Sequence, residues 1–67
     1  MERKIGENIR QIRQSLGLTQ KQFGEKIGVS PNCVCKWENK NYEPEFQVLR
    51  KMKEVFGISY EEIIDGI

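Results

Sequence analysis

The sequence predicts an all-α protein, a compact bundle of five helices in one domain of 67 residues. Apolar residues recur at intervals of three and four, whereas no stretch alternates apolar and polar residues for long enough to form a convincing strand. Two capping boxes, at residues 19–22 and 59–62, indicate where helices begin. Three glycines follow apolar runs directly, where a left-handed C-terminal cap is expected: Gly17, Gly28 and Gly57.

The first predicted helix ends before Gly17. Four apolar residues at steps of four, three and four line one of its faces: Ile5, Ile9, Ile12 and Leu16. We expect this face to lie against the core.

Thr19 opens the second helix, and Phe23 and Ile27 form its inner face before Gly28 ends it. Gly24 inside so short a helix costs about 1 kcal/mol relative to Ala. Its presence predicts the close approach of a neighbouring helix, because the missing side chain lets two backbones come together.

Ser30 and Pro31 mark the start of a third helix, with Ser at the N-cap and Pro at the first helical position. Val34 and Trp37, three residues apart, are expected to point inward. Residues 39–42 are predicted to form a loop.

Pro44 ends this loop, and a fourth helix follows that Gly57 terminates. Its inward residues are predicted to be Phe46, Leu49, Met52, Val55 and Phe56. Ser59 then opens a last short helix that contains Ile63 and Ile64.

The charges are unevenly distributed, although the net charge is only +1. Residues 1–42 hold eight basic and four acidic side chains, whereas residues 43–67 hold three basic and six acidic ones. This asymmetry favours one face for phosphate and another for a different contact; two ordinary solvated surfaces remain the alternative.

The composition is typical of a soluble globule, with 37% apolar and 31% charged residues. No apolar stretch is long enough to span a membrane, and none follows Arg3 and Lys4 as it would in a signal peptide. The expected compartment is therefore the cytoplasm.

Catalytic and metal chemistry have little support. The chain has no His, and its two Cys, Cys33 and Cys35, cannot by themselves complete a tetrahedral zinc site. At about 200° apart around a helix, they are not placed to bond to each other or share a metal. We expect reduced thiols, no cofactor, no metal and no enzyme; a redox switch on this helix is a minor alternative.

Residues 19–38 combine a two-turn helix, a tight turn at residues 28–30 and a second two-turn helix. This is the geometry of a helix-turn-helix, whose second helix enters the major groove of DNA. A reading helix needs a polar outer face, and here that face would carry Asn32, Lys36 and Cys33.

The segments Leu18-Thr19-Gln20-Lys21-Gln22-Phe23, Ile27-Gly28-Val29-Ser30 and Val34-Cys35-Lys36-Trp37-Glu38 together resemble the Cro and phage-repressor type of helix-turn-helix, also called XRE. The resemblance continues through residues 44–64. It implies the five-helix lambda-repressor-like fold and a cytoplasmic transcriptional regulator of bacterial or phage type, located at the nucleoid when bound to DNA.

The resemblance also implies roles for individual residues. Base-reading side chains are expected at Pro31, Asn32 and Lys36. Contacts to the DNA backbone are expected from Arg10, Gln20, Cys33, Asn39, Lys40 and Asn41. Arg13 and Glu38 match a pair that often forms a structural salt bridge in this family.

Three positions depart from the family pattern. Pro31 offers only apolar contact, for instance to a thymine methyl group. Gly24 and Lys53 replace residues that are usually Ala, and Lys53 is expected to extend its charge outward. The low total charge predicts few phosphate contacts and weak binding by a monomer.

The C-terminal segment carries more apolar surface than a short helix needs. The candidates for a two-fold dimer contact are Phe56, Ile58, Tyr60, Ile64 and Ile67. The sequence therefore predicts a homodimeric regulator, acting as a repressor, that binds a palindromic operator in double-stranded DNA without a small-molecule effector. The alternative is a protein-interaction module on the same fold, similar to an antirepressor or antitoxin.

Overall fold

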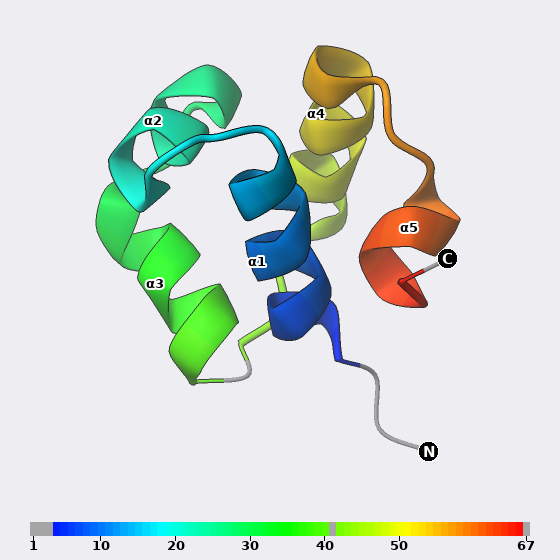
Figure 1. Cartoon of the computed structure of the whole chain (residues 1–67), viewed down its shortest axis with the longest axis horizontal. Coiled ribbons are helices and arrows are strands. Elements are labelled where there is room, and N and C mark those ends of the chain that lie inside the picture. Colours follow the sequence, from blue (N-terminus) through cyan, green and yellow to red (C-terminus); the bar gives the residue numbers. More distant parts are fainter. Residues whose placement is uncertain (1–3, 41, 67) are drawn as a thin grey trace.

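The computed structural model describes residues 4–40 and 42–66, which form helices and no strand. The helices are α1 (Ile5–Ser15), α2 (Gln20–Ile27), α3 (Pro31–Asn39), α4 (Phe46–Phe56) and α5 (Tyr60–Ile64). The predicted all-α fold of five helices is therefore confirmed. In Figure 1, α1 runs through the middle of the bundle, with α2 and α3 on one side and α4 and α5 on the other.

The ends of the helices follow the local signals in the sequence. Both predicted capping boxes are present: Thr19 caps α2 with Gln22, and Ser59 caps α5 with Glu62. The hydroxyl of Ser30 accepts a hydrogen bond from the backbone N–H of Cys33 and so caps α3. Left-handed glycines end α2 and α4, where an L side chain would be strained.

The core forms around α1, with side chains from every helix. The buried apolar residues are Ile5, Ile9, Phe23, Ile27, Val34, Trp37, Met52 and Ile63. The rings of Phe23 and Phe56 stack with centroids 4.8 Å apart and so join α2 to α4. The amide of Asn8 donates to the backbone carbonyl of Ile63 at 3.0 Å, which fastens the short α5 to α1.

Three residues that were predicted to point inward are exposed. Phe46 is 66% exposed, Leu16 44% and Val55 41%. Leu16 lies beyond the last turn of α1 as its C-cap residue. In α4, the face that packs on the core is centred on Met52, one turn from Val48. Phe46 and Val55 lie outside this face and are therefore exposed.

Phe46 instead stacks on Tyr60, with ring centroids 6.0 Å apart. The Nζ of Lys53 lies 4.7 Å from the centroid of the Tyr60 ring, so this exposed cation covers an aromatic face rather than extending freely into water.

Gly24 does allow a close backbone approach, but not by a neighbouring helix as predicted. A Cβ at this position would lie 2.6 Å from the carbonyl oxygen of Val29, in the turn that follows α2. The second such position is Gly6, which the sequence did not single out. A Cβ there would overlap the carbonyl oxygen of Trp37, because α1 and α3 pack backbone to backbone.

The predicted loop after α3 begins later than expected. Asn39 is the last residue of α3 and Lys40 is its C-cap, while Asn41 lies outside the described residues. Among residues 4–40 and 42–66, no helix has the length and apolar character needed to cross a bilayer.

Candidate nucleic-acid interface

A tight turn sets the angle between α2 and α3. Gly28 adopts φ 78° and ψ 28°, which reverses the chain direction at the end of α2. The backbone N–H of Val29 donates to the carbonyl of Gly24 at 2.9 Å, and Ser30 caps the next helix. This arrangement holds α3 across α2 and leaves one long side of α3 facing away from the bundle (Figure 1).

The outward side of α3 carries the three predicted base-reading residues. Pro31, Asn32 and Lys36 are all exposed, whereas Val34 and Trp37 on the opposite side are buried. Asn32 and Lys36 are four residues apart, so their side chains lie one turn apart on the same face. The structure thus brings an amide and an ammonium together on a convex helical surface.

The two cysteines occupy different sides of α3. Cys33 packs against the core, and its Sγ accepts a hydrogen bond from the hydroxyl of Ser30 at 3.4 Å. Cys35 is half-buried, is not among the side chains that pack on the core, and accepts a hydrogen bond from Asn39 at 3.2 Å. Both thiols are free. Cys33 is half-buried as well and lines the groove beside α3, so it lies at the edge of the outer face, and its contact to DNA stays a prediction.

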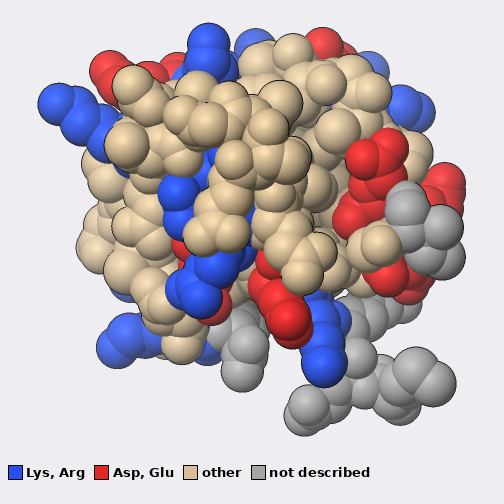
Figure 2. Space-filling model, viewed as in Figure 1, with Lys and Arg blue, Asp and Glu red and all other residues tan. Residues whose placement is uncertain are grey.

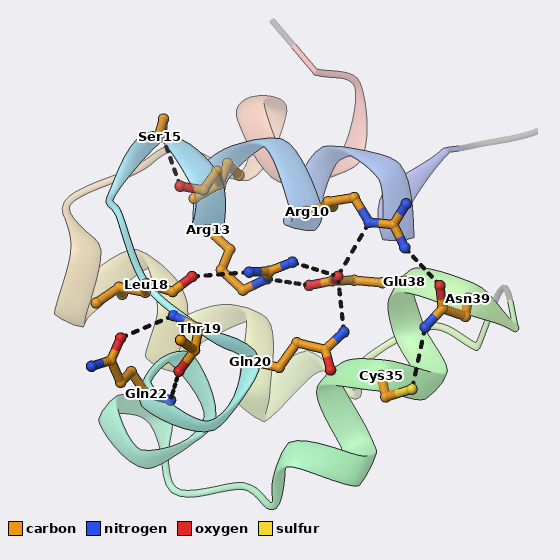
Figure 3. A network of polar contacts seen from close by, with 11 residues as sticks. Arg10, Arg13, Ser15, Leu18, Thr19, Gln20, Gln22, Cys35, Glu38 and Asn39 are labelled. Carbon is orange, nitrogen blue, oxygen red and sulfur yellow. Dashed lines mark hydrogen bonds and ion pairs between the residues drawn. The ribbon is translucent and has the colours of Figure 1, made fainter.

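The carboxylate of Glu38 joins the first three helices (Figure 3). Arg13 donates to it from Nε at 2.8 Å and from Nη2 at 3.0 Å. Gln20 donates at 3.1 Å and Arg10 at 3.3 Å. The side chain of Glu38 has no exposed surface, so four hydrogen bonds from three side chains compensate for its burial.

These contacts change the acidity of both partners. Burial alone raises the pKa of Glu38, but the hydrogen bonds from Arg13, Gln20 and Arg10 and the charge of Arg13 outweigh it, and the pKa falls below its ordinary value. The hydrogen bond to Glu38 raises the pKa of Arg13, and burial opposes this effect. The pair is therefore charged on both sides at neutral pH.

The network continues to the end of α3. The Nη2 of Arg10 donates to the side-chain oxygen of Asn39 at 2.6 Å, and Asn39 in turn donates to the Sγ of Cys35. Three residues expected at the DNA backbone, Arg10, Gln20 and Asn39, thus all contact other side chains of the protein (Figure 3). Their contacts to DNA stay predictions, as do those of Cys33 and of Lys40, which is exposed just past α3.

The sequence predicted only Arg13 as a partner of Glu38, and the structure adds Arg10 and Gln20. One signal was available for Arg10. It precedes Arg13 by three residues in α1, so the two guanidinium groups lie on the same face and meet the same neighbour.

An open groove of about 620 Å³ runs beside α3, between this helix and the start of α4. Val29, Trp37 and Val48 contribute apolar surface to it, and Glu43 and Glu45 contribute carboxylates. Two exposed carboxylates next to a surface that would meet phosphate reduce its attraction for DNA.

Charges of both signs appear on the face shown in Figure 2, and the acidic side chains gather mainly at the edge where α5 lies in Figure 1. This position agrees with the excess of acidic residues in the C-terminal part of the sequence. Glu43 and Glu45 are exceptions, because they lie beside α3 in the groove described above.

One family model matches most of the chain, and curated proteins of two bacteria are similar to it. The family model described as Helix-turn-helix matches residues 9–63. The HTH-type transcriptional activator BcrR of Enterococcus faecalis is 29% identical over 63 residues, which are 94% of this chain and 31% of that protein. The antitoxin PezA of Streptococcus pneumoniae is 30% identical over 60 residues, 90% of this chain and 38% of that protein. The chain thus spans about a third of the length of these curated relatives.

Among solved structures, the P22 c2 repressor in complex with a synthetic operator is similar, with a TM-score of 0.83 and 28% identity. The match covers 94% of this chain and 96% of that one.

Proposed function

The chain belongs to the helix-turn-helix family, and from this premise we propose that it binds double-stranded DNA sequence-specifically as a transcriptional regulator, with α3 in the major groove. One observation carries the proposal: the outward side of α3 presents Asn32 and Lys36, both exposed, on a helix that the turn at Gly28 holds away from the bundle. The likeness to a repressor solved with its operator supports it.

Each proposed base-reading residue has a distinct chemistry. The amide of Asn32 can pair with the N6 and N7 positions of adenine, and the ammonium of Lys36 can donate to the two acceptors of guanine. Pro31 has no polar group in its side chain and contributes contact with a thymine methyl group. Because each group distinguishes one base from the others, the three together specify a short half-site.

The backbone contacts come from the surroundings of α3. Lys40, exposed at the C-cap of α3, supplies a cation for phosphate, and Asn41 follows it in the sequence. Further contacts to phosphate come from residues that also bind other side chains of the protein: Arg10, Gln20, Cys33 and Asn39. Such contacts fix the orientation of the helix without reading sequence.

We further propose a homodimer that represses transcription from a palindromic operator. The apolar surface for the dimer combines Tyr60 with the exposed Phe46, whose rings stack on each other. Phe56, Ile58 and Ile64 contribute less than predicted, because all three pack against the core of their own protomer. Ile67 lies outside the described residues. The contact predicts dimers in sedimentation equilibrium; monomers alone, both free and on operator DNA, would contradict it.

The experiment that tests the function is enrichment of bound sequences from a randomised duplex library, followed by fluorescence anisotropy at two salt concentrations. We expect an inverted repeat with half-site centres about 34–36 Å apart. Asn32→Ala and Lys36→Ala should each cost about 1–3 kcal/mol on the enriched site and little on random DNA. Lys40→Ala should weaken both alike and lower the salt slope by about 1. Equal losses on every duplex from all three variants would contradict the division of roles.

A protein-interaction module on the same fold is the second candidate. The groove beside α3 favours it, because Glu43 and Glu45 repel phosphate while the apolar surface between α3 and α4 suits a peptide. A retained protein partner without salt-sensitive DNA binding would favour this candidate over the first. We propose that the protein binds its partner without catalysing a reaction. If the partner is DNA, we propose that the protein acts in the cytoplasm.

A further inference from the structure

We infer that Cys35 is a fourth reading side chain, and that Arg10 and Asn39 position it to contact the methyl group of a thymine. The inference rests on the proposed function and names a specificity-determining residue within the same site. It starts from a chain of side-chain contacts that leads from α1 to the outer face of α3.

The location of Cys35 comes from the periodicity of α3. Cys35 follows Pro31 and Asn32 by four and three residues and precedes Asn39 by four, so it lies within the exposed face that these residues form. Both cysteines are half-buried, but Cys33 packs on the core, whereas Cys35 is not among the side chains that do. Of the two thiols, Cys35 is therefore the one directed at the surface that meets DNA.

The orientation of Cys35 is set by Asn39. The side-chain oxygen of Asn39 accepts from Arg10 at 2.6 Å, which fixes the amide so that its nitrogen donates to the Sγ of Cys35 at 3.2 Å. Arg10 is held in turn by the buried Glu38 at 3.3 Å. A small, otherwise rotatable thiol thus keeps one position, which a specific contact requires.

The chemistry of a thiol selects the ligand group. Cysteine behaves as a small, polarisable apolar residue with a weak S–H donor. The major groove presents one apolar group, the C5 methyl of thymine. Cys35 therefore favours thymine over uracil at one position of the half-site, by about fourfold for the burial of one methyl group.

The test compares thymine with deoxyuridine, which differs only in the missing methyl group. Each thymine of the enriched half-site is replaced in turn, and the affinity is measured by anisotropy for the wild type, Cys35→Ser and Cys33→Ser. For the wild type we expect about a fourfold loss at one position that Cys35→Ser abolishes and Cys33→Ser retains. Cys33 is the matched control for the thymine preference, because it carries the same group on the core side of α3. If Cys33 contacts the DNA backbone as proposed, Cys33→Ser weakens binding to both duplexes equally and leaves the preference unchanged.

Asn39→Ala tests the positioning role. If Asn39 orients Cys35, this variant reduces the preference for thymine over deoxyuridine at the same position more than it weakens binding to random DNA. If Asn39 only contacts phosphate, affinity falls equally on every duplex and the preference stays, which would overturn this part.

The failures of the inference and of the proposed function are distinguishable. If the wild type enriches no sequence, the proposed function fails. If it enriches a site whose thymine preferences are the same in Cys35→Ser, the function holds and the role of Cys35 is refuted.

Discussion

Replacement of Glu38 by Gln should remove a large part of the stability of this domain, although the two side chains have almost the same shape. The carboxylate accepts four hydrogen bonds, three at Oε1 and one at Oε2. If the amide oxygen takes the place of Oε1, it retains the three hydrogen bonds there. The amide nitrogen then takes the place of Oε2 and faces the Nε–H of Arg13. Two donors oppose each other there, at a separation that is 2.8 Å in the native pair.

The magnitude follows from burial. Glu38 has no exposed side-chain surface, and that of Arg13 is 14% exposed, so water cannot replace the lost partner. Breaking a buried ion pair by neutralising one partner costs about 3–5 kcal/mol. A domain of 67 residues has a total free energy of unfolding of about 3–10 kcal/mol. We therefore expect Glu38→Gln to be marginally folded or unfolded at 25 °C.

Urea denaturation followed by tryptophan fluorescence measures this loss. Trp37 is the only Trp of the chain and is 6% exposed, so its emission reports the exposure of the core. Glu54→Gln is the matched control, since Glu54 pairs with Arg50 at 3.6 Å but both side chains are more than half exposed. This control should change stability by no more than about 0.5 kcal/mol.

A Glu38→Gln variant within about 0.5 kcal/mol of the control would refute the reasoning. It would mean that the carboxylate in solution is hydrated, or that its donors find other partners at no net cost. In that case Glu38 could not be what holds α1, α2 and α3 together.

Three further predictions concern other contacts. The lowered pKa of Glu38 contributes stability that is complete above the ordinary carboxyl pKa of about 4.3 and is lost as the pH falls through the lower pKa of the folded protein. The difference in unfolding free energy between wild type and Glu38→Gln, measured by urea titration, should therefore narrow below that pH; a constant difference would argue against it. Gly6→Ala should lower stability by about 1–3 kcal/mol despite the higher helix propensity of Ala, because its Cβ overlaps the carbonyl of Trp37; unchanged or higher stability would show that α1 and α3 can separate. Glu43→Gln combined with Glu45→Gln should increase the affinity for all duplexes by about two- to fivefold in anisotropy at low salt, because it removes two negative charges that repel phosphate. Unchanged affinity would show that these carboxylates do not lie close to the bound DNA.

The disagreements between prediction and structure share one cause. Phe46 and Val55 fit the apolar spacing of α4, but that spacing allows a face wider than the one the bundle covers. Gly24 signalled a close approach, and only the path of the turn showed that its partner is the carbonyl of Val29. A pattern along one helix reports how apolar residues are distributed around it, not which part of that face meets a neighbour.

The sequence by itself determined the number of helices and their capping at Thr19, Ser30 and Ser59, because each of these signals acts within about four residues. The helix-turn-helix followed from the order of two such helices around the turn at residues 28–30. Apart from the pair of Arg13 and Glu38, which the resemblance implied, only the tertiary structure decided which side chains meet across helices. It joined Glu38 to Arg10, 28 residues away. It also packed Cys33 on the core and left Cys35 outside it, which no local preference can settle. The crossing of α1, α2 and α3 places these groups within hydrogen-bond distance, and that crossing depends on how all the apolar faces fit together.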